Sequence, residues 1–175
     1  MKWAMPIRSA EPRDLAAITR IYAHAVSQGT ASFELEPPDE REMTRRHGEL
    51  RDGGFPFIVA DVEGAIAGYA YAGPYRARPA YRFTVEDSIY TDPTMQRRGI
   101  GRALLTRLLA ETEATGFRQM IAVIGDSANT PSIALHAAAG FRMVGTFESV
   151  GYKFGRWLDS VLMQKALGKG ATTVP

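Results

Sequence analysis

The sequence predicts a single α/β (α+β) domain with a mixed, mostly antiparallel sheet of six to seven strands and helices on both faces. The length of 175 residues suits one domain with a substantial core. A tight hairpin signal in the first half indicates antiparallel strands, and alternating strand-like and helix-like segments in the second half indicate locally parallel pairing. No repeat or linker divides the chain, so we expect one domain over residues 1–167 and a flexible tail over 168–175.

The first half of the chain begins with a short apolar run and a helix that starts at a proline. Pro12 suits a first helical turn, and the apolar residues after it recur at helical spacing. The next helix is mostly polar and stops at Gly53. Residues 62–64 form a tight turn between two apolar runs. The elements expected in this half are a strand at 7–10, a helix at 12–26, a loop at 28–38, a helix at 39–51, and strands at 57–61 and 65–72.

The second half is expected to alternate strands with helices. Residues 83–90 are β-branched and aromatic at alternate positions, which favours a strand. An amphipathic run from Ile100 ends at Gly116, and Thr130 followed by Pro131 has the pattern of a helix cap and first turn. The elements expected here are a loop at 73–80, strands at 82–91, 120–124, 141–149 and 157–164, and helices at 100–115 and 132–139.

Composition excludes several classes of protein. The net charge of +2 is small, so it gives no indication that the partner is a nucleic acid or an anionic lipid. The absence of cysteine excludes a disulfide framework, a thiol nucleophile and thiolate metal ligands. The first six residues are too short and mixed for a signal peptide, and no apolar run approaches the roughly 20 residues of a membrane span. We therefore expect a cytoplasmic protein that binds neither nucleic acid nor membrane.

The stretch Gln96–Arg102 joins a strand to an amphipathic helix through a turn that contains Gly99 and Gly101. Glycines at such a junction let the backbone approach a ligand closely, and the first N–H groups of the helix are free to bind an anion. Three arginines add positive charge, so a pyrophosphate is the expected ligand. A tight turn without a ligand remains the alternative here, because short glycine motifs are weak signals. The pattern matches neither the dinucleotide fingerprint nor the phosphate loop of nucleotide triphosphatases.

Three motifs stand out in the second half of the chain: Gln96-x-x-Gly99-x-Gly101 with the helix after it, Asn129-x-x-Ser132, and Gly140-Phe141. Together with the strand before the glycine turn, these motifs resemble those of the GNAT superfamily of acetyl-CoA-dependent N-acetyltransferases. The similarity covers residues 7 to about 165. Segments 81–90 and 151–159 look like those of the phosphinothricin and methionine sulfoximine acetyltransferases within that superfamily. The resemblance implies a GNAT-like sheet that is splayed at its centre, beside the strand before the turn.

The resemblance implies transfer of an acetyl group from acetyl-CoA, as cosubstrate, to an amine. Free backbone groups of the splayed strand would pair with the pantetheine arm, and the amides of the glycine turn would hold the pyrophosphate. The Asn-x-x-Ser residues would touch the pantetheine side. Carried over by position, the expected acetyl-CoA-binding residues are Ser88, Ile89, Tyr90, Gln96, Arg97, Arg98, Gly99, Ile100, Gly101, Arg102, Asn129 and Ser132.

Glu86 and His136 are the expected catalytic residues. Attack on a thioester requires a neutral amine, and a carboxylate with a raised pKa suits removal of the proton. Glu86 lies on an otherwise apolar strand, where burial would disfavour its charge; the alternative is an ion pair with a neighbour such as Arg82. His136 stands where many superfamily members have a tyrosine that protonates the thiolate, in agreement with the narrower subfamily. A histidine that only caps or packs is the alternative.

The loop after the hairpin is expected to select the substrate. Tyr75 and Arg76 resemble the pair that meets the acidic group of the substrate in relatives. A guanidinium binds a carboxylate or phosphinate through two parallel hydrogen bonds, so Arg76 favours a zwitterionic amino acid. Phe33 is expected either to line the substrate pocket or to be buried beneath a loop, where it would serve packing alone. The substrate-binding set is Phe33, Tyr75, Arg76, Ala77, Val85, Glu86 and Asp87.

The favoured activity is acetylation of the α-amino group of phosphinothricin, methionine sulfoximine or methionine sulfone. The alternatives are a protein N-terminal or polyamine acetyltransferase and a non-catalytic domain that senses acetyl-CoA. Glu86 and the arginine-bearing loop favour catalysis, and no acidic cluster suits a polyamine. We expect a homodimer, as in relatives, with Phe154 and Trp157 as core or dimer contacts. The histidines lack metal-ligand spacing, so no metal is expected.

Overall fold

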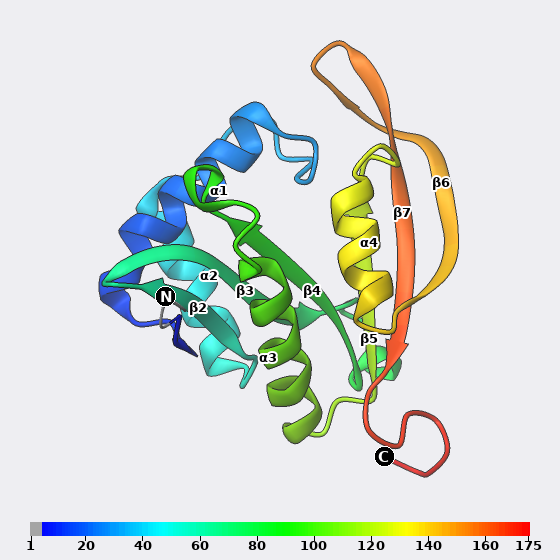
Figure 1. Cartoon of the computed structure of the whole chain (residues 1–175). Coiled ribbons are helices and arrows are strands. Elements are labelled where there is room, and N and C mark those ends of the chain that lie inside the picture. The colour runs from blue at the N-terminus through cyan, green and yellow to red at the C-terminus, as the bar shows by residue number, and fades with distance from the viewer. Residues whose placement is uncertain (1–4) are drawn as a thin grey trace.

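A computed structural model describes residues 5–175 and contains one seven-stranded sheet (Figure 1). The strand order is β1-β2-β3-β4-β5-β7-β6, and every neighbouring pair is antiparallel except β4 with β5. The predicted mixed, mostly antiparallel sheet is therefore confirmed. The strands are β1 (Ile7–Ser9), β2 (Phe57–Val62), β3 (Ala65–Pro74), β4 (Thr84–Thr91), β5 (Gln119–Gly125), β6 (Arg142–Lys153) and β7 (Arg156–Ala166). The helices of the described chain are α1 (Leu15–Gln28), α2 (Glu40–Asp52), α3 (Ile100–Ala114) and α4 (Thr130–Ala138).

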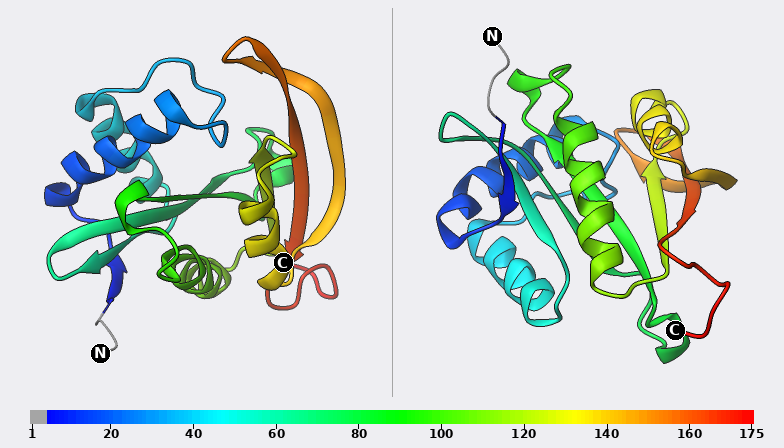
Figure 2. Two further views of the ribbon diagram at one scale, coloured as in Figure 1. Left: turned by 45° about the horizontal axis from the view of Figure 1, so that its top comes forward. Right: turned by 60° about the horizontal axis from the view of Figure 1, so that its bottom comes forward.

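Helices cover both faces of the sheet, as Figures 1 and 2 show. Alternation along the strands divides the core, because successive side chains point to opposite faces. Phe57 and Val59 of β2 pack with α1 and α2, whereas Ile58 and Ala60 pack with α3. The apolar faces of α1 and α3 thus bury against opposite sides of the same strands. Burial of such side chains is worth ~1.5–3 kcal/mol for each large aliphatic or aromatic residue.

The sheet is splayed between its two parallel strands, as the resemblance implied. β4 and β5 pair at only three positions, from Thr84 with Gln119 to Glu86 with Ile121. Beyond this point β4 continues to Thr91 and β5 to Gly125 without pairing to each other. The two strands diverge in Figure 1, and the opening lies at their carboxyl ends. Ligands of sheets with parallel strands bind at this end.

Several element boundaries differ from those predicted. β4 begins at Thr84 instead of residue 82, because Pro79–Tyr81 form a short 3-10 turn before it. The cap of α4 is Asn129, one residue before the predicted Thr130, and its side-chain oxygen accepts the N–H of Ser132 at 3.3 Å. Proline at the second helical position then suits the first turn.

The last two strands are longer than predicted and form one continuous hairpin. β6 reaches Lys153 and β7 starts at Arg156, with only Phe154 and Gly155 between them. Both connecting residues have positive φ, 52° and 72°, which is the conformation of a two-residue hairpin turn. A phenylalanine rarely adopts this conformation, so the sequence carries no ordinary signal for the turn.

Residues after the last strand turn back toward Arg118, at the start of β5. The guanidinium of Arg118 donates hydrogen bonds to Thr173 Oγ1 at 2.9 Å and to the carbonyl oxygen of Val174 at 3.0 Å. The mobility of residues 168–175 stays a prediction. Over residues 5–175, none of the helices combines the length and the apolar character that crossing a bilayer requires.

Candidate functional site

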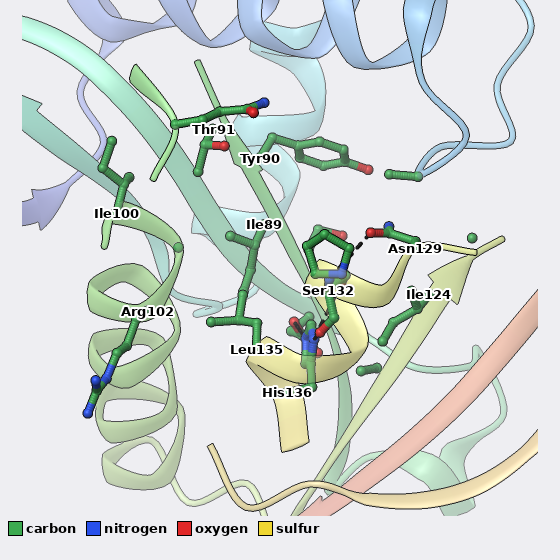
Figure 3. Close-up of a pocket in the computed structure, with 18 of the residues that line it drawn as sticks. Ile89, Tyr90, Thr91, Ile100, Arg102, Ile124, Asn129, Ser132, Leu135 and His136 are labelled. Carbon is green, nitrogen blue, oxygen red and sulfur yellow. Dashed lines mark hydrogen bonds and ion pairs between the residues drawn. The ribbon is translucent and has the colours of Figure 1, made fainter. Parts of the chain in front are cut away.

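A cavity of about 690 Å³ occupies the opening between β4 and β5. Its walls are the carboxyl-terminal parts of these two strands, the turn before α3, and the first half of α4. Residues 122–125 of β5 form the wall opposite β4. The labelled residues in Figure 3 come from these elements and surround one space, from which the side chain of Arg102 extends away. They are Ile89, Tyr90, Thr91, Ile100, Arg102, Ile124, Asn129, Ser132, Leu135 and His136.

The turn before α3 is shaped to bind an anion. Gly99 precedes the first helical residue with φ 77°, and Arg97 also has positive φ, 63°. No side chain caps this terminus, so its first N–H groups stay available together with the positive end of the helix dipole. A Cβ on Gly101 would lie 3.4 Å from Leu135 Cδ2, on the opposite side of the cavity mouth. The backbone amides of this turn therefore lie directly at the wall of the cavity.

The cavity contains eleven of the twelve residues predicted to bind acetyl-CoA; the exception is Arg98. Asp87 and His136, predicted for other roles, also line it. The sequence reasoning missed Ala31, Thr91, Pro131, Leu135 and the whole β5 wall. The signal for these residues is weak, because only the crossover through α3 places β5 beside β4.

Glu86 lies on the face of β4 opposite to Asp87, because consecutive strand residues alternate. Val85 is fully buried on the α3 side, so Glu86 points toward α1 and α2. Burial and the neighbouring charge of Asp87 raise the pKa of Glu86 to about 7, against the opposing effect of Arg76. The alternative ion pair with Arg82 is not formed: that guanidinium lies 4.5 Å from the ring centroid of Phe83 and donates to the carbonyl oxygen of Pro79.

His136 and Asp87 form a buried pair at the wall of the cavity. The Nε2 atom of His136 lies 2.9 Å from Oδ2 of Asp87, and its Nδ1 atom lies 2.8 Å from the carbonyl oxygen of Ser132. The side chains are 5% and 2% exposed, and the ring of Phe141 packs edge-on against the imidazole at 5.0 Å. Burial lowers the pKa of His136, but the carboxylate outweighs it and the net shift is upward. Both ring nitrogens are therefore engaged.

The predicted selectivity loop lies outside the cavity, on the side of Glu86. The backbone N–H of Tyr75 donates to the carbonyl oxygen of Thr84 at 3.3 Å. The exposed Arg76 guanidinium stands 5.1 Å from the ring centroid of Tyr75, and its charge lowers the pKa of Glu86. Ala77 is exposed in the same loop. The positive charge of Arg76 therefore lies close enough to Glu86 to stabilise its ionised form.

The loop between α1 and α2 contacts the β6–β7 hairpin through a buried hydrogen bond and a packed aromatic ring. The buried Nζ of Lys153 donates to the carbonyl oxygen of Ser32 at 2.8 Å, and burial lowers the pKa of Lys153. The ring of Phe33 packs against the backbone at Gly125 and Gly151, where an added Cβ would lie 3.0 Å and 2.5 Å from it. Phe33 therefore bridges the two halves of the molecule. Lys153 was not predicted as part of this region.

Within residues 5–175, no cluster of three or more His, Asp or Glu side chains is arranged to hold a metal ion.

Comparison with known proteins gives consistent matches over most of the chain. Residues 7–162 match the family described as acetyltransferase (GNAT) domain. A phosphinothricin N-acetyltransferase of Alcaligenes faecalis is 53% identical over 98% of this chain and 87% of its own. An L-methionine sulfoximine/L-methionine sulfone acetyltransferase of Salmonella typhimurium is 40% identical over 95% and 97% of the two chains. The crystal structure of a phosphinothricin acetyltransferase from Sinorhizobium meliloti in complex with AcCoA has a TM-score of 0.96 at 48% identity, covering 100% and 94%.

Proposed function

This chain belongs to the GNAT family of acetyltransferases, and on that premise we propose that it acetylates the α-amino group of a small amino acid such as phosphinothricin, methionine sulfoximine or methionine sulfone. Acetyl-CoA is the proposed donor. The observation that carries the proposal is the cavity in the split sheet, which runs from an uncapped helix terminus to the strand that bears Glu86. A donor site and a basic group with a pKa of about 7 thus lie on one strand.

The residues at the cavity fit the parts of acetyl-CoA. The amides of residues 97–102, with Arg97 and Arg102 beside them, suit the diphosphate. Beyond Glu86, β4 has no strand partner on the β5 side, so the backbone of residues 88–90 is free to pair with the pantetheine amides. Asn129 and Ser132 line the same path. Acetyl-CoA, when bound there, supplies a thioester carbonyl that a neutral amine can attack.

Glu86 is the proposed general base. An α-ammonium must lose a proton before it can attack, and a base with a pKa near the working pH combines a large ionised fraction with good proton affinity. The pKa of about 7 meets this requirement, and burial is its main cause. The absence of an ion pair with Arg82 leaves the carboxylate available to the substrate.

Arg76 is proposed to bind the acidic group of the acceptor. Replacing it with alanine should raise the Michaelis constant for the amino acid about 10- to 100-fold, because a charge-assisted hydrogen bond contributes ~1.5–3 kcal/mol. The Michaelis constant for acetyl-CoA should stay near that of the wild type. Arg82→Ala is the matched control, since Arg82 is an exposed arginine nearby that contacts Phe83. Equal effects of Arg76→Ala on both Michaelis constants would contradict the assignment.

The proposed activity is tested by following the release of coenzyme A thiol from acetyl-CoA in the presence of different amines. The panel contains phosphinothricin, methionine sulfoximine, methionine sulfone, ordinary amino acids, polyamines and peptides with a free N-terminus. The zwitterionic amino acids should give the highest kcat/KM. A preference for polyamines or peptides would replace the proposed substrate class, and no release with any amine would favour an acetyl-CoA sensor.

A homodimer is the proposed assembly, supported by an apolar surface on the β6–β7 hairpin. Phe154 and Trp157 are 56% and 62% exposed, so they do not belong to the core. Other large apolar side chains of the hairpin are similarly exposed, which is typical of an interaction surface. A second copy of this chain is the proposed occupant. The remaining members are Met143, Val144, Phe147, Val150 and Tyr152.

Light scattering after size-exclusion chromatography should give twice the chain mass of 19.2 kDa. The Phe147→Glu variant should shift to the monomer mass, because a charge in an apolar contact loses its hydration. Glu148→Gln, an exposed change at the adjacent position, is the control. A monomeric wild type at micromolar concentration, or a dimer that Phe147→Glu leaves intact, would overturn this surface as the interface.

A further inference from the structure

Within the proposed reaction, on which this inference rests, we propose that Lys153 is a positioning residue for the acceptor. Its buried ammonium holds the α1–α2 loop (residues 29–39) in the arrangement that borders the acceptor side of the split sheet. Lys153 itself contacts neither substrate, because it acts through the loop and through Phe33, which the loop carries. Three observations support this role: the burial of the ammonium, the hydrogen bonds that meet at Ser32, and the place of the loop beside Glu86.

Lys153 is buried in a part of the hairpin whose neighbouring side chains are exposed. It is 4% exposed, whereas Tyr152 and Phe154 are 57% and 56% exposed. Its Nζ atom donates to the carbonyl oxygen of Ser32 at 2.8 Å. Burial lowers the pKa of Lys153, the carboxylate of Glu34 raises it, and the net shift is downward. An apolar side chain of similar size would avoid the loss of hydration, so stability alone does not account for a lysine here.

Hydrogen bonds from three elements meet at Ser32 and Glu34. From β6, Lys153 holds the carbonyl oxygen of Ser32. From α1, the hydroxyl of Tyr22 lies 2.9 Å from Ser32 Oγ and donates to Glu34 Oε1 at 2.8 Å. From α2, Arg46 donates to the same carboxylate oxygen at 2.6 Å. Residues 32–34 are thus held from both sides, and Lys153 supplies the hydrogen bond from the hairpin.

The α1–α2 loop lies on the side of the sheet toward which Glu86 points. Tyr90 belongs to the same face of β4 as Glu86, and its ring packs edge-on against that of Tyr22, with 4.9 Å between the centroids. Tyr22 in turn is hydrogen-bonded to the loop at Ser32. The loop spans from the two helices to the hairpin (Figure 1). An acceptor that reaches Glu86 from this side is therefore bordered by the loop.

Phe33 is the side chain whose place depends on this arrangement. Its ring lies against the backbone of Gly151 in the hairpin and of Gly125 at the end of β5, and it is 39% exposed. Gly125 also lines the cavity, so the ring stands where the donor side and the acceptor side meet. Within residues 29–39, Ala31 alone lines the cavity. Release of the loop should therefore weaken the binding of the acceptor and leave that of acetyl-CoA almost unchanged.

The test compares the kinetics of Lys153→Met with those of the wild type. Methionine fills a similar volume but neither donates to Ser32 nor carries a charge. The Michaelis constant for the acceptor should rise about 10-fold, because a smaller fraction of molecules holds the loop in the arrangement that binds. The kcat at saturating acceptor and the Michaelis constant for acetyl-CoA should stay within about twofold of the wild type. A general structural defect would not separate the two Michaelis constants.

Hydrogen exchange provides a readout that does not depend on turnover. The amides of residues 29–39 should exchange about 10-fold faster in Lys153→Met, whereas those of β4 should keep their wild-type rates. The melting temperature should not fall, because methionine buries no charge. Lys169→Met, the same change at an exposed lysine after β7, is the matched control and should alter none of these quantities.

An unchanged Michaelis constant for the acceptor in folded Lys153→Met would overturn the inference. Equal increases in both Michaelis constants would also overturn it, because they would mark a distortion of the whole site. If Lys153→Met does not fold, Lys153→Gln decides in the same way, since its shorter side chain stays polar but is too short to keep the contact with Ser32. An inactive wild type would refute the proposed function instead. In that case, unchanged exchange of residues 29–39 would still overturn the hold of Lys153 on the loop.

Discussion

Gly101→Glu should abolish the binding of acetyl-CoA without unfolding the protein. Gly101 is the second residue of α3, where its backbone lies at the mouth of the cavity beside Leu135. A glutamate there would extend into the cavity and place a negative charge against the diphosphate. Each charge-assisted hydrogen bond that is lost costs ~1.5–3 kcal/mol, so loss of two or more raises the dissociation constant by at least about 100-fold. An acidic residue in the first turn of a helix is itself favourable for the helix dipole, so the fold should persist.

Titration calorimetry with acetyl-CoA measures the effect, and thermal unfolding measures stability. The matched control is Gly48→Glu, which makes the same change within α2 at a position where an added Cβ has open space. Gly48→Glu should bind acetyl-CoA like the wild type. An unchanged affinity in Gly101→Glu would show that the turn before α3 does not hold the diphosphate, and the proposed donor site would then be wrong.

The position of the proposed donor site was predictable because the sequence signals for it are local. The strand, the glycine turn and the helix follow one another within about twenty residues, so their order alone places the free amides at a strand end. The uncapped terminus and the positive φ of Gly99 agree with that order. The opposite wall of the cavity is β5, which is joined to β4 by the longer connection through α3. Nothing in the β5 sequence itself says that it pairs with β4 at three positions and then separates.

The regions that escaped prediction join segments that are distant in sequence. Lys153 reaches the carbonyl oxygen of Ser32 across 121 residues, and a single lysine in a polar-looking turn gives no hint of burial. The hairpin that carries it turns at Phe154 in a conformation that aromatic residues seldom adopt. The contact between Asp87 and His136 likewise spans 49 residues. The roles proposed for these site residues stay predictions until the variants are measured.

Glu86→Gln should lower kcat about 100-fold or more and remove its rise near pH 7. In the wild type, a base with a pKa of about 7 is protonated and inactive in acid, so kcat should climb through neutral pH. Glutamine fills the same space but accepts no proton. The affinity for acetyl-CoA should not change, because Glu86 is not among the residues that line the cavity. The pH dependence of kcat and calorimetry with acetyl-CoA provide the two measurements.

The stability of the Glu86→Gln variant separates a chemical defect from a folding defect. The pKa of Glu86 is raised in the folded protein, from 4.5 to about 7, because burial disfavours its charge. The contribution of Glu86 to folding stability is therefore fully present below its unfolded pKa of 4.5 and is lost as pH rises through its folded pKa of about 7. Removing the charge should leave the variant at least as stable as the wild type at pH 8. Glu113→Gln, an exposed change on α3, is the control. A variant that is fully folded, binds acetyl-CoA and keeps the wild-type pH profile would exclude Glu86 as the base.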